Sequence, residues 1–267
     1  MADPVPTMRH DPEVLGLMEA AEAFARHAGE VTLRWFGGMV RADTKGDGTP
    51  VTEADREAER TLRADIEQRY PSHGILGEEF GETRPDAEVR WIVDPIDGTK
   101  SFMHGVPLYG VLIGIERRGE PVVGVAHFPA LDETVVAGSG LGCWWNGSPA
   151  HVSGVGAISD ALVLTTDAPT ILSGPVGPGW AALQSAARFT RTWGDCYGHV
   201  LVATGRADVM VDPILSAWDA APLLTIVREA GGRFTSLDGV ETIHGGSGVS
   251  SNGPLHDAVL KRLRAPG

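Results

Sequence analysis

The chain has few cysteines and no long apolar run. Cys143 and Cys196 are its only cysteines among 267 residues, too few for a disulfide framework and without the C-x-x-C spacing of zinc or redox sites. We interpret both as free thiols, which fits a reducing compartment. No stretch approaches the roughly 18 consecutive apolar residues of a membrane span, and residues 1–11 lack the apolar centre of a signal peptide. We expect a cytoplasmic protein without membrane contact.

Positive charge is also scarce. The sequence has 22 Lys and Arg against 35 Asp and Glu, a formal net charge of -13. Nucleic acid and anionic lipid bind proteins mainly through Lys and Arg that neutralise phosphate, so neither is expected as a partner. An acidic protein that binds an anionic substrate needs local positive charge at the binding site. Bound divalent cations supply that charge in a small volume.

Apolar residues make up 42% of the chain, enough for a sizeable core. Apolar positions at helical spacing predict helices over residues 12–36, 52–70, 180–189, 197–206, 218–230 and 256–263. Apolar and β-branched runs predict strands over residues 74–77, 89–93, 111–115, 122–128, 135–137, 142–145, 161–165, 208–211 and 248–251.

Helices and strands interleave without a strict βαβ repeat, which favours a layered α+β fold over a doubly wound parallel sheet. After an N-terminal tail of residues 1–11, we expect two closely packed subdomains. Residues 12–140 would form an α+β unit that carries a metal site, and residues 141–267 an α/β unit that completes it.

An unusual pair of acids flanks a proline in residues 91–99, which read WIVDPIDGT. Strand interiors avoid Asp, and we expect Pro95 to end the strand so that Asp94 and Asp97 converge. The backbone carbonyl of Ile96 would lie between the two carboxylates. Hard cations such as Mg²⁺ bind oxygen ligands of this kind, together with waters and substrate phosphate. Taken alone, the same residues could form an ordinary turn.

Other acids could complete this site. Glu78 and Glu79 end another apolar segment, and only one of them can point toward the Asp pair. Asp219 opens a helix, where the helix dipole favours an acid. Asp55 follows Thr52 in the Thr-x-x-Asp pattern of a helix start. Each also has a plain structural interpretation, as a solvated loop, an N-cap and a capping-box acid respectively.

Taken together, the motifs resemble those of the inositol monophosphatase superfamily. The resemblance rests on three linked motifs, which occur in the family's order and rough spacing: Gly77-Glu-Glu79, residues 91–99 with Ser101-Phe102, and Trp218-Asp219 with Ala230-Gly-Gly232. It covers the chain from about residue 12 to 263 and implies the α/β/α/β/α sandwich of the inositol monophosphatase and fructose-1,6-bisphosphatase type. It also implies a Mg²⁺-dependent phosphomonoesterase and a homodimer.

The resemblance also implies a set of metal ligands, with two or three Mg²⁺ per active site: Glu78, Asp94, the Ile96 carbonyl, Asp97 and Asp219. The chemistry of the residues agrees, because several carboxylates and a carbonyl can hold cations that clamp the attacking and leaving oxygens of a phosphoryl transfer. Glu79 is a further possible ligand. Lys45 and Asp47 fall where the family has a mobile metal-sensing segment, although a solvated turn would look the same.

The family pairs the threonine of its central motif with an acid, here Thr99 with Asp55. With Glu78, this pair would orient and deprotonate the attacking water. The amides of Gly98 and Thr99 would cradle phosphate oxygens. Cys196, the alternative nucleophile, lacks an identifiable base, and we expect it to be structural or to line the substrate site.

Residues 191–199, which read RTWGDCYGH, bear on the substrate. Asp195 and residues 97–102 (DGTKSF) resemble the histidinol-phosphate phosphatase branch. A buried Asp195 would pair with the amine or imidazole of histidinol phosphate, whereas neutral inositol offers no cation. Asp195 could also be a capping or structural residue, and Arg191 could contact the leaving group or reach across a dimer interface. His199 is expected to be an ordinary buried helix histidine.

We therefore expect hydrolysis of L-histidinol phosphate to L-histidinol and phosphate, a step of histidine biosynthesis. The expected substrate contacts are Glu78, Ile96, Asp97, Gly98, Thr99, Arg191, Asp195 and Asp219. Inositol 1-monophosphate is the first alternative substrate, followed by fructose bisphosphate or a nucleoside bisphosphate.

Two other classes of protein fit the sequence less well than a phosphatase. A metal-binding regulator without catalysis would need the carboxylates but neither Thr99 nor Asp55, and both are present. A dinucleotide-binding oxidoreductase would need G-x-G-x-x-G between a strand and a helix, and the glycine-rich runs of this chain lack that context.

Overall fold

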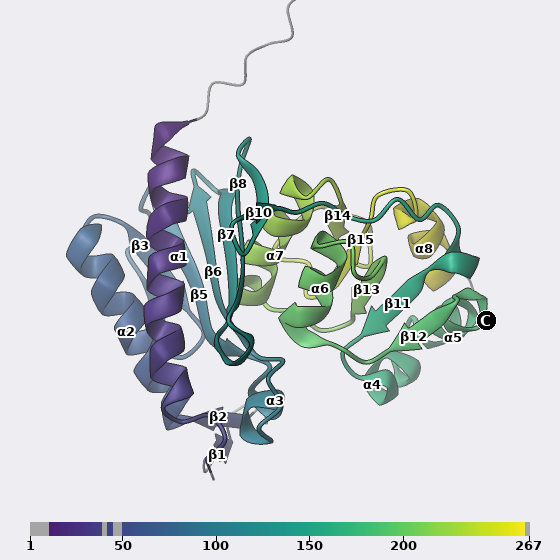
Figure 1. Cartoon of the computed structure of the whole chain (residues 1–267), viewed down its shortest axis with the longest axis horizontal. Coiled ribbons are helices and arrows are strands. Elements are labelled where there is room, and N and C mark those ends of the chain that lie inside the picture. Colours follow the sequence, from purple (N-terminus) through teal and green to yellow (C-terminus); the bar gives the residue numbers. More distant parts are fainter. Residues whose placement is uncertain (1–10, 39–41, 45–49, 265–267) are drawn as a thin grey trace, which may run out of the picture.

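The computed structural model describes residues 11–38, 42–44 and 50–264, which fold into alternating layers of helix and sheet (Figure 1). Lys45 and Asp47 lie outside the described residues, as does the expected tail apart from Asp11. None of the helices in these ranges has both the length and the apolar character needed to span a bilayer.

Two long helices form the first layer. Helix α1 (Pro12–Leu33) starts at Asp11, whose carboxylate accepts the backbone N–H of Glu13 at 3.0 Å. Helix α2 (Glu53–Arg69) starts with the expected capping box of Thr52 and Asp55. The apolar stripes of both helices pack on one face of the first sheet. Close by, β1 (Ala42–Thr44) and β2 (Pro50–Thr52) form an antiparallel pair.

The first sheet has eight strands in the order β10-β9-β8-β7-β6-β5-β3-β4, and only the β3–β5 pair is parallel. The strands are β3 (Gly74–Gly77), β4 (Gly81–Thr83), β5 (Val89–Asp97), β6 (Gly110–Arg117), β7 (Glu120–Phe128), β8 (Glu133–Gly138), β9 (Gly142–Trp145) and β10 (Ser148–Pro149). A short helix, α3 (Thr99–Met103), follows β5, and a 3₁₀ turn, η1 (Pro129–Leu131), follows β7.

The second sheet has five strands in the order β12-β11-β13-β15-β14. The strands are β11 (Leu162–Thr165), β12 (Phe189–Arg191), β13 (Val209–Asp212), β14 (Arg233–Thr235) and β15 (Gly248–Ser251). Its outer face is covered by α4 (Ala168–Ser173), α5 (Gly177–Ala186) and α8 (His256–Leu263), and a 3₁₀ turn, η2 (Ile158–Asp160), precedes β11.

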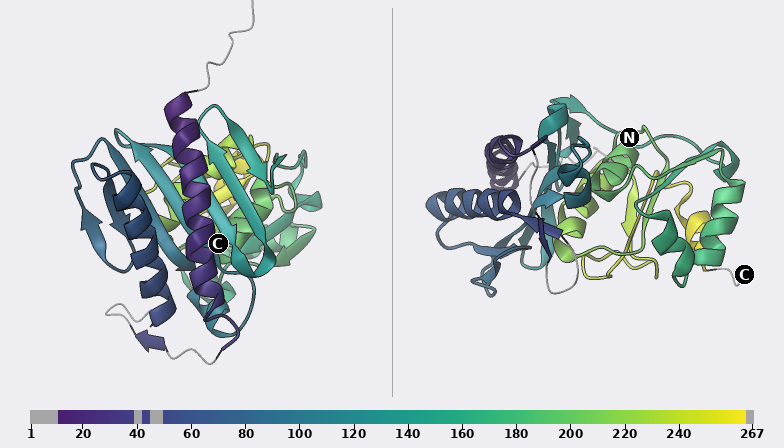
Figure 2. Two further views of the ribbon diagram at one scale, coloured as in Figure 1. Left: turned by 60° about the vertical axis from the view of Figure 1, so that its left-hand side comes forward. Right: turned by 90° about the horizontal axis from the view of Figure 1, so that it is seen from below.

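Helices α6 (Asp195–Ala203) and α7 (Ala217–Glu229) fill the space between the two sheets (Figures 1 and 2). The layers therefore run α/β/α/β/α, which confirms the layered α+β sandwich that the sequence predicts. The first sheet includes β9 and β10 and so continues beyond residue 140. The division into subdomains at that residue stays a proposal.

Helix α7 lies close against the first sheet because two strand residues beneath it lack side chains. A Cβ built on Gly124 would lie 2.2 Å from the backbone oxygen of Pro222, and one built on Gly114 would lie 2.7 Å from the Cβ of Ala221. At 2.2 Å an added Cβ would clash with the Pro222 backbone, which cannot move aside as a flexible side chain could. This close approach holds α7, whose first turn carries Asp219, against β6 and β7.

The second half differs from the sequence prediction in several places, and the prediction includes neither helix α4 nor strand β14. A helix is predicted over residues 180–189, but α5 ends at Ala186 and Phe189 already begins strand β12. The helix predicted from residue 197 begins at Asp195 instead. Asp195 is therefore part of the helix start and not of a preceding loop.

Candidate active site

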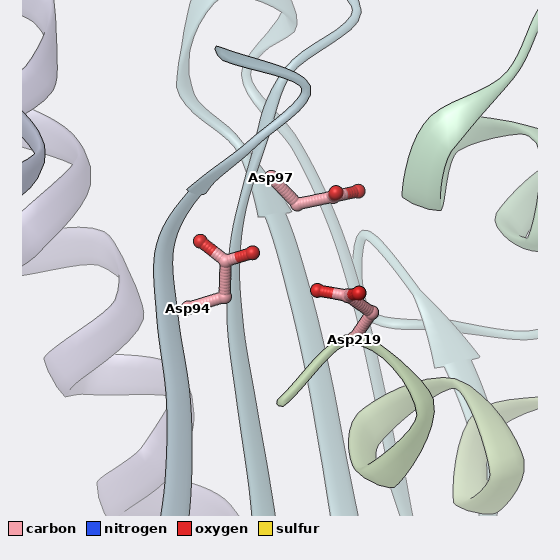
Figure 3. A group of neighbouring side chains, drawn as sticks. All are labelled: Asp94, Asp97 and Asp219. Atoms are coloured by element: carbon pink, nitrogen blue, oxygen red, sulfur yellow. The ribbon is translucent and has the colours of Figure 1, made fainter. Parts of the chain in front are cut away.

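Three carboxylates meet where β5 ends and α7 begins. Asp94 and Asp97 belong to β5 and Asp219 to the first turn of α7, and Figure 3 shows the three side chains turned toward one another. Each carboxylate has one oxygen atom that can face a shared ion, and these three oxygen atoms all lie within 4.8 Å of one another. The fold thus brings these distant parts of the sequence within reach of a shared cation.

A β-bulge turns Asp94 and Asp97 to the same side of the sheet. Residues three apart in a regular strand point to opposite faces. Here Asp94 pairs with Leu112 and Asp97 with Gly110, so β5 contains one residue more than β6 over this stretch. The prediction that Pro95 ends the strand is wrong, because β5 continues to Asp97 and the proline lies inside the bulge, where no ladder N–H is needed.

Glu78 reaches the same place from the neighbouring strand. Strands β3 and β5 are parallel, and Gly77 pairs with Val93, so the next residues, Glu78 in the turn after β3 and Asp94 within β5, lie side by side. The backbone N–H of Glu78 donates to the oxygen of Val93 at 3.3 Å, and its carboxyl group is hydrogen-bonded to that of Asp94. Of the adjacent acids Glu78 and Glu79, one is expected to point toward the Asp pair, and Glu78 does so.

Asp219 has two roles. It is the acid of a capping box, in which its Oδ2 accepts the backbone N–H of Ser216 at 2.8 Å. Ser216, and not Asp219, is the N-cap of α7. The cap fixes the rotation of the Asp219 carboxylate, which at the same time faces Asp94 and Asp97.

The fold alone leaves this negative charge poorly compensated. Burial raises the pKa of Asp94 well above its usual range, and the charges of Glu78 and Asp219 raise it further. Burial also raises the pKa of Asp97 well above its usual range, with Asp195 as the next contributor. For Asp219, burial raises the pKa to about 7. A bound divalent cation would compensate the negative charge and lower these carboxyl pKa values.

The donor set fits a hard divalent cation. The cluster offers carboxylate oxygens, which Mg²⁺ prefers, whereas nitrogen and sulfur donors favour zinc. The thiol nearest to it, Cys196, is buried, and burial raises its pKa well above the usual range, so it does not supply a thiolate. The backbone N–H of Cys196 instead donates to Asp97 Oδ2 at 2.5 Å. Cys196 also lines the smaller cavity, so both predicted roles, structural or lining the substrate site, stay open for it.

Thr99 and Asp55 lie together beside the acids. Thr99 is the first residue of α3, and its Oγ1 lies 3.2 Å from the carbonyl oxygen of Ile96 and 3.5 Å from Asp55 Oδ1. Asp55 is buried, and its other oxygen accepts the backbone N–H of Thr52 in the cap of α2. Burial raises the pKa of the Asp55 carboxyl.

Two adjoining cavities of about 230 and 450 Å³ open at this site. Asp97 and Asp219 line the smaller one, and Glu78, Gly98 and Thr99 line the larger. Four residues line both: Lys100, Thr166, Asp167 and Asp195. A ligand that fills both cavities would therefore contact Asp195.

Asp195 occupies a strained position between the two cavities. Its φ of +51° is unusual for a residue with a side chain. Its Oδ2 would lie 3.2 Å from a Cβ built on Gly98. Burial raises the pKa of Asp195, and the charge of Lys100 opposes this rise. Gly194 is the N-cap of α6, which has no side-chain cap bond, so the alternative of Asp195 as a capping residue finds no support.

Thr166 and Asp212 both line the smaller cavity, and neither is predicted from the sequence. Thr166 Oγ1 accepts the backbone N–H of Asp195 at 2.9 Å and donates to Asp212 Oδ2 at 2.6 Å. Burial raises the pKa of Asp212 to about 6. The only signal in the sequence is that each polar residue ends an apolar run, and the parallel strands β11 and β13 bring these ends together.

Arg191 and His199 lie elsewhere. Arg191 is exposed on β12, where its Nη1 donates to the carbonyl of Thr190 at 2.7 Å, and it lines a different cavity. Whether it contacts a substrate in its own subunit or in a partner stays a prediction. His199 is fully buried in α6; its Nδ1 lies 2.7 Å from Ser250 Oγ, whereas its Nε2 has no hydrogen-bond partner among the described residues, so the expected helix histidine is only half satisfied.

Comparisons with known proteins agree with this architecture. The model of the inositol monophosphatase family matches residues 15–265. The chain is 45% identical to a histidinol-phosphatase of Chlorobaculum parvum over 89% of this chain and 93% of that protein. It is 43% identical to a histidinol-phosphatase of Mycobacterium tuberculosis over 97% of this chain and 100% of that protein.

A solved structure has the same fold. The extragenic suppressor protein suhB of Bartonella henselae superposes with a TM-score of 0.87 at 28% identity, over 94% of this chain and 100% of that one. With a family match that spans nearly the whole sequence, the chain belongs to the inositol monophosphatase family and is a phosphoric monoester hydrolase.

Proposed function

We propose that this phosphatase depends on Mg²⁺ and hydrolyses L-histidinol phosphate to L-histidinol and phosphate. The observation that carries the choice of substrate is Asp195, a mostly buried carboxyl group that lines both cavities beside the acid cluster. Histidinol phosphate offers an amine and an imidazole to such a group, and a charge-assisted hydrogen bond favours a cation there. The high identity to two histidinol-phosphatases supports the same substrate.

The metal would be held by oxygen atoms at the ends of β3, β5 and α7. The proposed ligands of two or three Mg²⁺ are Glu78, Asp94, the Ile96 carbonyl, Asp97 and Asp219. When bound, such ions lower the pKa of water and stabilise charge on phosphoryl oxygens. Without them, the raised pKa values of the three aspartates would leave the cluster partly protonated.

The remaining steps fall to the residues of the chain. The amides of Gly98 and Thr99 would bind phosphate oxygens. The Thr99 hydroxyl, which donates to Asp55, would orient the attacking water, and Asp55 would accept the proton that the water loses. As the water oxygen bonds to phosphorus, the ester P–O bond breaks and the alcohol leaves with a proton from solvent. The raised pKa of Asp55 suits a group that must take up a proton.

The test compares kcat/KM for three esters with and without Mg²⁺: histidinol phosphate, inositol 1-monophosphate and fructose 1,6-bisphosphate. We expect phosphate release to require Mg²⁺ and histidinol phosphate to be the best substrate. Full activity after exhaustive chelation would refute the metal dependence. Metal binding without phosphate release from any ester would favour the non-catalytic regulator.

The variant Asp195→Asn tests the specificity argument. Asn tolerates the left-handed backbone conformation, so the substitution removes the charge with little change in strain. We expect kcat/KM for histidinol phosphate to fall about 10- to 100-fold, as for loss of a hydrogen bond to a charged group. Turnover of inositol 1-monophosphate should change less than about threefold. Equal losses on both esters would remove Asp195 as the residue that selects the substrate.

A further inference from the structure

Glu59 is a buried acid on α2 that the proposed chemistry does not use. Its side chain is fully buried, in a helix face otherwise lined by Ala58, Leu62 and Ile66. A buried carboxylate is unfavourable unless charges and hydrogen bonds compensate it. The compensation here comes largely from the turn after β3, and that turn contains Glu78.

Both oxygens of Glu59 bind this turn. Oε2 accepts the backbone N–H of Glu79 at 2.7 Å, and Oε1 accepts that of Phe80 at 3.2 Å. Oε1 also lies against Gly77, because a Cβ built there would be 2.0 Å away. The carboxylate therefore touches the residue before Glu78 and the two residues after it.

Arg63 completes the arrangement one helical turn further along. Its Nε donates to Glu59 Oε1 at 2.8 Å, and its Nη2 donates to the carbonyl of Gly81. The side chain of Arg63 is only 13% exposed. Glu59 and Arg63 thus hold the backbone on both sides of Glu78, while the carboxyl group of Glu78 is directed to Asp94.

We propose that Glu59 is a positioning residue for the metal ligand Glu78, with Arg63 as its partner, an inference that rests on the proposed metal-dependent function. A metal ligand on a turn is placed accurately only if the backbone of that turn is fixed, and supporting contacts of this kind change metal affinity about 10- to 100-fold when removed. Glu59 itself has its oxygens directed to the turn and Arg63 and does not face the acid cluster.

The variant Glu59→Gln tests this inference. Each group that faces the carboxylate is a donor, namely two backbone N–H groups and the Arg63 Nε–H, so the amide N–H₂ of Gln would oppose a donor. We expect the Mg²⁺ concentration for half-maximal activity to rise at least tenfold, whereas kcat at saturating Mg²⁺ stays within about threefold. In the absence of substrate, Mg²⁺ should raise the Tm only at correspondingly higher concentrations.

Glu57→Gln is the matched control. Glu57 lies on the same helix and also holds an arginine and a donor N–H, those of Arg34 and Trp35, but it does not contact the turn. We expect the control to bind Mg²⁺ as the wild type does, even if its Tm falls. Glu59→Gln with a lowered Tm but unchanged Mg²⁺ affinity would overturn the inference.

A second variant keeps the test decisive if Glu59→Gln does not fold. Arg63→Lys keeps the charge but cannot bridge Glu59 and Gly81 as the guanidinium does, and we expect a three- to tenfold weaker Mg²⁺ response. An unchanged response in that variant would also overturn the inference. A wild-type protein that shows neither Mg²⁺-dependent Tm nor phosphate release would instead refute the proposed function.

Discussion

Asp94 is buried among other acids and carries a charge that the fold alone does not neutralise. Its surroundings suit a bound cation and disfavour the free carboxylate, which is why its pKa is raised by burial and by Glu78. Groups of this kind reduce the stability of a protein that lacks its ligand. At this position, stability and metal binding therefore favour different side chains.

We predict that Asp94→Asn stabilises the metal-free protein and abolishes its activity. At pH 8 with a chelator, the free energy of unfolding should rise by roughly 1–2 kcal/mol, because one buried charge is removed. A carboxyl with a raised pKa binds more protons folded than unfolded, so its destabilising effect is full above the raised pKa and disappears as the pH falls toward the usual value near 4. The gain should therefore shrink between pH 8 and pH 5.

Urea unfolding with a chelator at both pH values measures this gain, and added Mg²⁺ provides the comparison. The wild type should gain stability from Mg²⁺, whereas the variant should gain little. A variant that is less stable than the wild type in chelator at pH 8 would contradict the prediction.

Single residues also show how far the sequence can be read. The acids of the proposed metal site, Glu78, Asp94, Asp97 and Asp219, could be picked out because they lie in motifs that follow the family's order and rough spacing. Glu59 and Thr166 were not, because an acid in a helix and a threonine after a strand are common, and their contacts depend on which elements lie beside them. The unusual backbone of Asp195 leaves no trace in the sequence.

At the scale of elements, the position of α7 depends on two glycines beneath it, Gly114 in β6 and Gly124 in β7. We predict that Gly124→Ala destabilises the protein by about 1–3 kcal/mol, as overpacking does, and weakens Mg²⁺ binding. The reason is that the new Cβ would meet the backbone oxygen of Pro222 at 2.2 Å and push away the helix that carries Asp219. Thermal unfolding with and without Mg²⁺ measures both effects.

Gly16→Ala is the control for this substitution. Gly16 lies within α1, and a Cβ built there would have no heavy atom within 4 Å. Alanine should stabilise this helix by about 0.5–1 kcal/mol and leave the Mg²⁺ response unchanged. If Gly124→Ala bound Mg²⁺ as well as Gly16→Ala does, the placement of Asp219 would not depend on the close packing of α7.

Two elements show why element boundaries were harder to predict than element types. Strand β5 continues through Pro95, since a bulge needs no N–H at that residue, although proline usually marks the end of a strand. Strand β12 has only three residues and pairs on one side with β11, so its sequence carries no long alternating pattern. In both cases the pairing with a neighbouring strand decides the structure.

At the scale of the whole molecule, the layers could be predicted and the sheet order could not. Apolar content and the interleaving of helices and strands indicate layered packing, and the motifs of residues 77–79, 91–99 and 218–219 identify the fold. The order of strands, and the position of β9 and β10 within the first sheet, depend on contacts between distant residues. No local pattern in the chain records those contacts.

Buried histidines in several layers should make the whole molecule sensitive to acid. Burial lowers the pKa of His127 on β7 to about 4, that of His199 on α6 to about 3 and that of His256 on α8 to about 4. His256 links α8 to the second sheet, with its two ring nitrogens 2.8 Å from Ser251 Oγ and 3.0 Å from Thr235 Oγ1. These residues stay neutral in the folded protein at pH values where the unfolded chain is protonated.

We predict that His256→Gln reduces this acid sensitivity. A histidine with a lowered pKa binds fewer protons folded than unfolded, so its favourable contribution is full above about pH 6.5 and is lost as the pH falls toward about 4. Between pH 7 and pH 5, the wild type should therefore lose about 2 kcal/mol of unfolding free energy relative to the variant. Contributions from the carboxylates are common to both proteins and cancel in this difference.

Denaturant unfolding of both proteins across this pH range measures the difference, with His151→Gln as the control. The side chain of His151 is exposed, so its surroundings change little on unfolding and the control should follow the wild type. Parallel curves for the wild type and His256→Gln would show that the second sheet tolerates a charged His256, and the acid sensitivity would then have to arise in the first sheet or in the helices between the sheets.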